Sequence, residues 1–252
     1  MPIQNRIAEF QKDMQKWRHH FHEFPELAYK EVNTAKKVVE LLKKFNVDKI
    51  ETGIGGTGVV ATLKNGAGRS VGLRADMDAL PIKEENKKNY CSKNKGVMHA
   101  CGHDGHTSML LGAVKYLSET RKFKGKVVCI FQPAEEGFAG AKAMIEDGLF
   151  KKYPVDEIYG MHNMPNLKEG VLAVQEGPRL AAADNFEIEI VGKGAHGAMP
   201  SNSIDPIVCG SALVQNLQHI VSRNSNPKET LVITIASFHS GKANNVIPKN
   251  AT

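Results

Sequence analysis

Residues 126–131, with the sequence KVVCIF, place five apolar residues in an uninterrupted run after Lys126. A short run of this kind predicts a strand that is buried on both faces. Residues 132–137 (QPAEEG) follow directly and bring two glutamates to the end of that strand. Sheets of buried strands are covered by helices on both faces, as in α/β proteins. We therefore expect an α/β fold with polar groups at the end of a central strand.

Other segments of the chain extend this pattern. Short apolar segments predict further strands at residues 59–63, 71–73 and 157–161. Apolar residues at helical spacing predict helices at residues 3–21, 33–42, 107–117 and 141–149. Helices that alternate with buried strands predict a mostly parallel buried sheet flanked by helices.

Acidic or histidine side chains follow three of the predicted strands. They are Asp76, Asp78, Glu135, Glu136 and His162. Open α/β sheets bind ligands in the crevice outside the carboxyl ends of their strands. Taken alone, Asp76 and Asp78 also fit a surface turn. Together the three clusters predict one polar site at this edge of the sheet.

Residues 97–106 (VMHACGHDGH) place a cysteine and three histidines close together in the chain. Cysteine and histidine are preferred ligands of zinc and similar ions. Cys101 and His103 are two positions apart, so they would not share one face of a helix. A loop suits them better, because Gly102 and Gly105 let the backbone turn. The alternative is a histidine-rich turn without a metal, and the acidic strand ends favour the metal site.

The pattern changes in the last third of the chain. Residues 186–191 and 231–238 alternate between apolar and polar side chains, which predicts strands exposed on one face. Residues 205–221 between them predict an amphipathic helix. We therefore expect two domains, residues 1–182 and a smaller α+β domain of residues 183–252.

Composition excludes some classes of function. The net charge is +6, but the lysines are scattered and not interleaved with aromatic residues, so we expect no nucleic-acid partner. No apolar run approaches the ~18 residues of a membrane span, so we expect no membrane partner. The four cysteines form no disulfide framework, which favours a reducing, cytoplasmic location.

Six motifs resemble the dinuclear-metal amidohydrolases of the aminoacylase/carboxypeptidase metallopeptidase family. Within that family the resemblance is to the hippurate hydrolase and N-acyl-L-amino acid amidohydrolase group. The motifs are RADMDALP, HACGHDGH, FQPAEEG, GMHNMP, GKGAHGAMP and NVIP. The resemblance runs from about Arg18 to the end of the chain. It implies that residues 1–182 are a catalytic domain with two divalent ions. Residues 183–252 would then belong to an inserted lid or dimerisation domain.

The resemblance also implies roles for individual residues. Glu135 would be the general base that takes a proton from a metal-bound water. Asp78 occupies the place of a carboxylate that orients the metal site, and Asp76 would assist it. The implied metal ligands are Cys101, His103, Glu136 and His162.

Two lid residues are implied as well. His196 is similar to a lid histidine that reaches the active site of the partner subunit, where it would stabilise the oxyanion. Asn245 resembles a lid residue near the substrate carboxylate. Many relatives have histidine where this chain has Ser201, and that departure puts one minor contact in doubt. The resemblance also implies a last ligand histidine in a segment after the lid, which this chain, ending at Thr252, does not contain.

The expected function is therefore hydrolysis of the amide bond of N-acyl amino acids, N-acetyl or N-benzoyl (hippurate-like), by a metal-bound water. The two ions would be zinc, manganese, cobalt or nickel, and the enzyme would be a homodimer joined through the lid. For the 252-residue chain alone we expect one tightly bound ion at most and little activity. The alternatives are a truncated, non-catalytic metal-binding or dimerisation module and, less favoured, a nucleic-acid binder.

Overall fold

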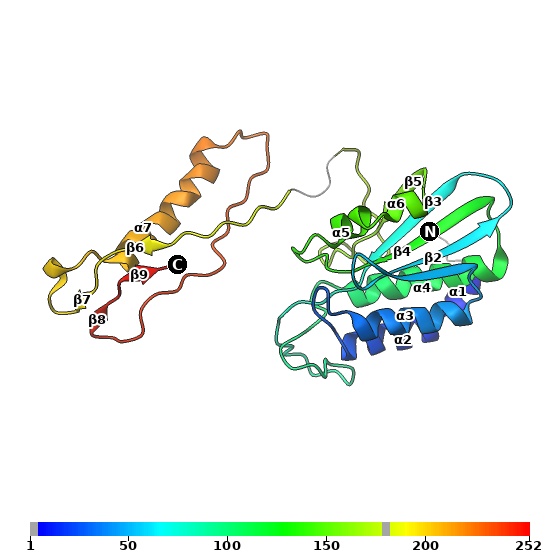
Figure 1. The fold of residues 1–252 in the computed structure, drawn as a ribbon, viewed down its shortest axis with the longest axis horizontal. Coiled ribbons are helices and arrows are strands. Elements are labelled where there is room, and N and C mark those ends of the chain that lie inside the picture. The colour runs from blue at the N-terminus through cyan, green and yellow to red at the C-terminus, as the bar shows by residue number, and fades with distance from the viewer. Residues whose placement is uncertain (1–4, 178–181) are drawn as a thin grey trace. The chain divides into compact units, whose positions relative to one another are not determined.

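The computed structural model describes residues 5–177 and 182–252, which form two compact units, Met1–Val171 and Leu172–Thr252 (Figure 1). The predicted domain boundary between residues 182 and 183 lies further along the chain, beside residues 178–181, which are outside the described residues. It stays a prediction. The predicted start of the first helix, at residue 3, also lies outside the described residues.

The first unit contains a five-stranded sheet in the order β1-β2-β4-β3-β5. Strand β2 is antiparallel to both β1 and β4, while β3 is parallel to both β4 and β5, so only β2 runs against the others. The predicted mostly parallel sheet is confirmed. Strand β1 is not among the predicted strands. The strands are β1 Lys49–Ile54, β2 Gly58–Asn65, β3 Ser70–Asp76, β4 Gly125–Gln132 and β5 Glu157–Gly160.

Helices cover both faces of this sheet (Figure 1). One face is covered by α1 Asn5–Glu9, α2 Gln11–Glu23, α3 Val32–Lys44 and α4 His103–Thr120. The other face is covered by α5 Gly140–Glu146 and α6 Leu149–Lys152. Among the described residues, no helix is both long enough and apolar enough to cross a membrane.

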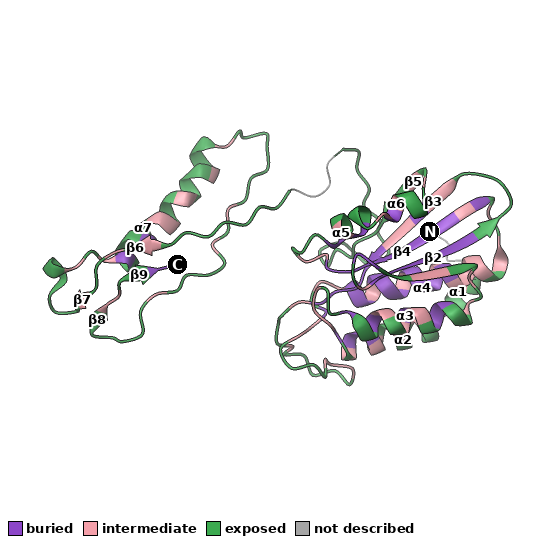
Figure 2. Cartoon of the chain, viewed as in Figure 1, coloured by how far each residue is buried: buried purple, intermediate pink, exposed green. Residues whose placement is uncertain are grey.

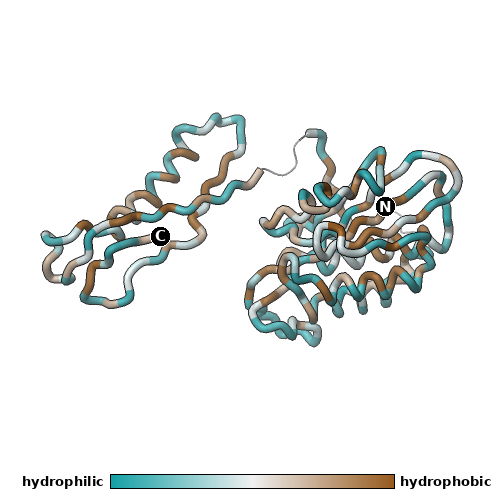
Figure 3. Tube along the Cα trace, in the orientation of Figure 1, coloured by the Kyte–Doolittle hydropathy of each residue, from teal (hydrophilic) through white to brown (hydrophobic). Residues whose placement is uncertain are grey.

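Alternate side chains of the central strand β4 enter two separate cores, because successive side chains of a strand point to opposite faces. Val127, Cys129 and Phe131 pack with α2, α3 and α4, whereas Val128 and Ile130 pack with α5 and α6. Hydrophobic residues accordingly concentrate in the sheet, while the helices alternate in hydropathy along their length (Figure 3). Phe131 is completely buried, so its replacement by alanine should cost about 3–5 kcal/mol.

The parallel strands bring the predicted polar clusters to one edge of the sheet. Asp76, the last residue of β3, pairs in register with Gln132, the last residue of β4. The chain after β5 leaves the sheet at the same edge, since β5 is parallel to β3. One detail of the prediction is wrong, because β5 is not buried: Ile158 is 49% exposed and Tyr159 is 57% exposed. Strand β5 lies at the margin of the sheet and has a neighbour on one side only.

The second unit is built around helix α7, Pro206–His219. The helix begins at an N-cap, where the carboxylate of Asp205 accepts from the N–H of Ile207 at 2.8 Å. A 3₁₀ turn, Pro200–Asn202, precedes it and a π-helical turn, Ile220–Asn224, follows it. Two short strand pairs complete the unit: β6 Ile190–Val191 with β9 Asn250–Ala251, and β7 Ala195–His196 with β8 Val246–Ile247.

The two strands predicted in this unit are largely wrong. Only residues 190–191 of the segment 186–191 form a strand, and residues 231–238 are in no strand among the described residues. Alternating apolar and polar residues indicate which side chains face the interior. They do not indicate whether the segment has a hydrogen-bonded neighbour, which a strand also needs. The alternating apolar side chains, including Phe186, Ile188 and Phe238, still line an apolar cavity of about 460 Å³ against α7. Most residues of this unit are exposed (Figure 2).

Candidate metal centre

Gly102 connects the cysteine-histidine loop to helix α4. Its φ of 88° lies in the left-handed region, and a Cβ atom there would lie 2.4 Å from Oδ1 of Asn163. Any other residue would therefore be strained and would clash. The tight turn places Cys101 one residue before the N-cap Gly102 and makes His103 the first residue of the helix.

His103 lies at the centre of the site. Its side chain is fully buried, and neither ring nitrogen has a hydrogen-bond partner among the described residues. Nδ1 lies 3.3 Å from Oδ1 of Asp78. Nε2 faces Oε1 of Glu136 at 3.7 Å and Oε2 of Glu135 at 3.9 Å, both too distant for a hydrogen bond. The predicted ligand and base residues thus surround one ring nitrogen that no protein group satisfies.

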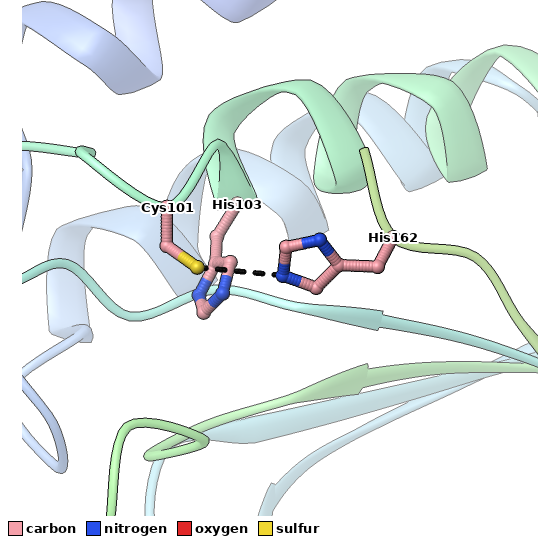
Figure 4. Close-up of side chains that lie close together, drawn as sticks. All are labelled: Cys101, His103 and His162. Atoms are coloured by element: carbon pink, nitrogen blue, oxygen red, sulfur yellow. Dashed lines mark hydrogen bonds between the residues drawn. The ribbon is translucent and has the colours of Figure 1, made fainter. Parts of the chain in front are cut away.

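Cys101 and His162 complete the cluster beside His103 (Figure 4). Sγ of Cys101 lies 3.3 Å from Nε2 of His162. Nδ1 of His162 lies 2.7 Å from the carbonyl oxygen of Asn163, which can accept a hydrogen bond from Nδ1–H. A proton held on Nδ1 leaves the Nε2 lone pair directed toward Cys101 and free to bind an ion.

The unsatisfied atoms of this cluster fit a metal ion. Oε1 of Glu136 and Nε2 of His103 are buried without a hydrogen-bond partner among the described residues, whereas Nδ1 of His103 and Oδ1 of Asp78 face each other. Buried polar atoms are normally paired, so two orphaned atoms that face each other need an explanation. One potential ligand atom from each of Cys101, His103 and His162 lies within 4.8 Å of the other two, and the same holds for His103, Glu135 and Glu136. The residues present therefore suit divalent ions with nitrogen, sulfur and oxygen ligands.

The two glutamates differ in their surroundings. The backbone N–H of Glu136 donates to Oδ2 of Asp78 at 3.0 Å, and the side chain of Glu136 is 23% exposed. The side chain of Glu135 is 38% exposed. Glu135 is consequently the more solvent-accessible of the two carboxylates.

The predicted supporting carboxylate Asp76 lies at the end of β3, where it is completely buried. Arg74 donates to Oδ2 of Asp76 at 2.7 Å, and Nδ1 of His106 lies 2.6 Å from Oδ1. On the other side of the ring, Nε2 of His106 lies 3.0 Å from the backbone nitrogen of Asn163 and 2.5 Å from its side-chain oxygen Oδ1. Burial would raise the pKa of Asp76, but the hydrogen bond from His106 and the charge of Arg74 lower it to about 2.

The pKa of Cys101 shifts upward when no ion is bound, in contrast to that of Asp76. Burial, together with the neighbouring negative charges of Glu136 and Glu135, raises the pKa of its thiol to about 12. The thiol is therefore protonated at neutral pH in the ion-free protein. A bound cation favours the thiolate and reverses this preference.

The two predicted lid residues lie side by side in the second unit. His196 pairs with Val246 in the β7/β8 ladder, and the N–H of Gly197 donates to the carbonyl of Asn245 at 2.8 Å. Nδ1 of His196 accepts from the N–H of Ala198 at 3.2 Å. A neutral His196 ring therefore carries its proton on Nε2.

The sequence prediction missed two groups of residues around this centre. His106 links Asp76 to Asn163, the residue next to His162. Both His106 and Asn163 stand inside recognised motifs to which the sequence prediction gave them no role. His22 and Asp104 form a second buried pair, with Nδ1 of His22 2.8 Å from Oδ2 of Asp104. No local spacing signals that pair, because its members are far apart in the sequence.

Comparisons with known proteins agree with this geometry. The family model described as "Peptidase family M20/M25/M40" matches residues 72–243, more than half of the chain. Hippurate hydrolase of Campylobacter jejuni is 48% identical over 247 residues, covering 98% of this chain and 64% of that protein. N-acyl-L-amino acid amidohydrolase of Geobacillus stearothermophilus is 44% identical over 248 residues, covering 98% of this chain and 66% of that protein.

A solved structure is similar as well. The YXEP protein of Bacillus subtilis, described as a dinuclear metal binding peptidase from the M20 family, has a TM-score of 0.70 and 36% sequence identity, covering 97% of this chain and 63% of that chain. The chain thus spans slightly less than two thirds of the length of these relatives. The family resemblance of the motifs is confirmed by the match over residues 72–243. The chain belongs to peptidase family M20/M25/M40.

Proposed function

We propose that this protein hydrolyses the amide bond of N-acyl amino acids with the help of two divalent ions. The observation that carries the proposal is that Glu135 and Glu136 face a ring nitrogen of buried His103 that has no protein partner. The substrate class is supported by the relatives, whose names specify hippurate and N-acyl-L-amino acids. N-acetyl and N-benzoyl amino acids are therefore the proposed substrates.

The proposed ions are zinc, manganese, cobalt or nickel, because a mixed thiolate, imidazole and carboxylate set accepts all four. When bound, they would lower the pKa of a water molecule and polarise the amide carbonyl. Asp78 would keep the ring of His103 oriented from the Nδ1 side. Asp76 would support the same ring, because its Oδ2 lies 3.7 Å from Nε2 of His103, and it also contacts His106. The residues proposed to hold the ions are Cys101, His103, Glu136 and His162.

Glu135 is the proposed general base and acid. Its partly exposed carboxylate can accept a proton from the attacking water as the new C–O bond forms. It can then donate that proton to the amide nitrogen as the C–N bond breaks, which releases a carboxylic acid and a free amine. Glu136 is the proposed metal ligand, because its Oε1 is buried without a hydrogen-bond partner among the described residues and is suited to an ion.

His196 is the proposed oxyanion donor. The N–H of Ala198 occupies Nδ1 of His196, so Nε2–H is the donor that the ring can offer to a substrate. One such donor contributes typically about 3 kcal/mol to transition-state stabilisation. Asn245, held next to His196, would offer its side-chain amide to the substrate carboxylate.

We propose that His196 is supplied by a second subunit and that the protein is a homodimer joined through the lid, residues 183–252. The exposed apolar side chains of the lid, including Phe186, Ile188 and Val232, support this arrangement, because exposed apolar surface favours association with another chain. Sedimentation velocity tests it. A fully active enzyme that remains monomeric at assay concentration would contradict the proposal.

A cytoplasmic location is also proposed. All four cysteines are free, and Cys101 has to be reduced in order to bind an ion. A reducing compartment preserves that state.

The rival function is a metal-binding or dimerisation module without catalysis. The free carboxylate of Glu135 favours an enzyme, because a purely structural metal site needs no base beside it. A panel of N-acetyl and N-benzoyl amino acids, incubated with the purified full-length protein before chelation, after chelation and after re-addition of each ion, separates the two. Ion-dependent release of free amino acid supports the enzyme. Tight ion binding without any release supports the module and overturns the proposed function.

A further inference from the structure

Glu31 is a completely buried carboxylate to which neither the sequence motifs nor the proposed mechanism assigns a role. It stands at the N-cap position of α3, where acidic side chains usually accept hydrogen bonds from the first N–H groups of a helix. Glu31 makes no such capping bond. The carboxylate of Glu26 does so instead, accepting from the N–H of Thr34 at 2.8 Å. The side chain of Glu31 therefore makes its hydrogen bonds with residues other than those of α3.

Its partners lie outside the helix. Oε1 of Glu31 accepts from the backbone N–H of Ala134 at 2.8 Å, and Oε2 accepts from the hydroxyl of Thr57 at 2.5 Å. Ala134 directly precedes Glu135. Burial raises the pKa of Glu31, and the hydrogen bonds from Thr57 and Ala134 oppose that effect, so these two contacts offset part of the cost of burying the carboxyl group.

Ala134 has an unusual backbone conformation. Its φ is 51°, in the left-handed region, where a residue with a Cβ atom is strained. Such a conformation persists only when several neighbours hold it. Here the N–H is held by Glu31, and the carbonyl accepts from the N–H of Gly140 at 2.9 Å. The backbone torsions of Ala134 set the direction of the chain that carries Glu135 and Glu136.

The segment that contains Glu31 touches the rest of the centre at two more points. The carbonyl of Glu26 accepts from the N–H of Ala79, next to Asp78, at 2.8 Å. The hydroxyl of Tyr29 donates to the carbonyl of Phe138 at 2.8 Å. Residues 26–31 therefore contact both acidic loops of the centre, and Glu31 makes the contact closest to the glutamates.

We propose that Glu31 is a positioning residue of the metal centre. By accepting from the N–H of Ala134, it holds this residue in the left-handed conformation that directs Glu135 and Glu136 toward His103. The inference rests on the proposed function for the roles of Glu135 and Glu136. The experiment measures ion affinity as well as hydrolysis, so the positioning role of Glu31 and the proposed function can fail separately.

The experiment compares Glu31→Ala, Glu31→Gln and the double variant Glu31→Ala/Ala134→Gly with the unchanged protein. Zinc affinity is measured by competition with a chromophoric chelator, and the kinetic constants are measured on an N-acyl amino acid. Glu31→Ala should weaken zinc binding about 10- to 100-fold and lower kcat more than it raises KM. Glu31→Gln should lose less, because its amide oxygen can still accept from Ala134. The double variant should recover about fivefold of the lost affinity, because glycine adopts a positive φ without strain.

Glu26→Ala is the matched control, since it removes a carboxylate from the same segment whose hydrogen bonds, within the described residues, go to Asn33 and Thr34 at the start of α3. It should lower thermal stability without changing zinc affinity more than about twofold. Unchanged affinity in Glu31→Ala, an equal loss in Glu26→Ala, or no recovery in the double variant would overturn the proposal. If the unchanged protein binds zinc but hydrolyses no N-acyl amino acid, the proposed function fails, and the affinity comparison still decides the role of Glu31.

Discussion

Asp78 and His103 meet with Oδ1 of the carboxylate 3.3 Å from Nδ1 of the ring, while the other oxygen of Asp78 accepts from the N–H of Glu136. A single buried carboxylate thus contacts a proposed ligand histidine and the backbone of a proposed ligand glutamate. Burial raises the pKa of Asp78, but the contacts with His103 and the backbone of Glu136 outweigh it and lower the pKa. Asp78 is therefore ionised at neutral pH and can hold a proton on Nδ1 of His103.

Replacement of Asp78 by alanine should weaken zinc binding about 10- to 100-fold, because the ring of His103 would lose the carboxylate that orients it. Chelator competition measures the change. Asp156→Ala is the control, since Asp156 accepts from Ser70 at the opposite end of β3. Equal zinc affinities in the two variants would argue against the orienting role of Asp78.

Cys101 should release a proton when an ion binds. Its thiol is protonated in the ion-free protein, with a pKa raised to about 12, and it binds as the thiolate. Calorimetric titrations with zinc at about pH 8, in two buffers of different ionisation enthalpy, count the protons released. Cys101→Ala should release about one proton fewer than the unchanged protein. The same count in both proteins would show that Cys101 is not a ligand.

His22 should make stability depend on pH. The hydrogen bond to Asp104 raises the pKa of His22 above its ordinary value of 6.5, and this outweighs the opposite effect of burial. A raised folded-state pKa stabilises the fold fully below the unfolded pKa, and this contribution disappears as the pH rises through the folded pKa. In urea unfolding of the ion-free protein, the stability lost in His22→Gln should therefore be larger at about pH 6 than at about pH 9. A loss that is equal at both pH values, or larger at high pH, would contradict this assignment.

The edge of the sheet that holds the site could be predicted from the sequence, because the carboxyl ends of parallel strands meet at one edge. The prediction rests on the three polar clusters that follow predicted strands, Asp76 and Asp78, Glu135 and Glu136, and His162. The exposure of β5 was not predictable, because apolar content does not distinguish a central strand from a marginal one. The absence of a strand at residues 231–238 has a similar cause, since alternation contains no information about a hydrogen-bonded neighbour.

Within the site, the proposed ligands stood in recognisable motifs, but the residues that hold them did not. Glu31 reaches Ala134 across more than one hundred positions of the chain, and no spacing rule connects the two. His106 was visible in its motif, yet its partners Asp76 and Asn163 become neighbours only in the folded sheet. Such contacts depend on how helices and loops pack, and a single sequence does not specify that packing at the level of side chains.

The central claim is that Glu135 moves a proton while Glu136 binds an ion, and one comparison tests it most directly. Glu135→Gln and Glu136→Gln are each assayed for bound metal by elemental analysis and for hydrolysis of N-acyl amino acids, alongside the unchanged protein. The account predicts that Glu135→Gln keeps its ions and loses hydrolysis by at least about 100-fold, whereas Glu136→Gln loses ions as well as activity. Retained hydrolysis in Glu135→Gln, or the same loss of metal in both variants, would contradict it.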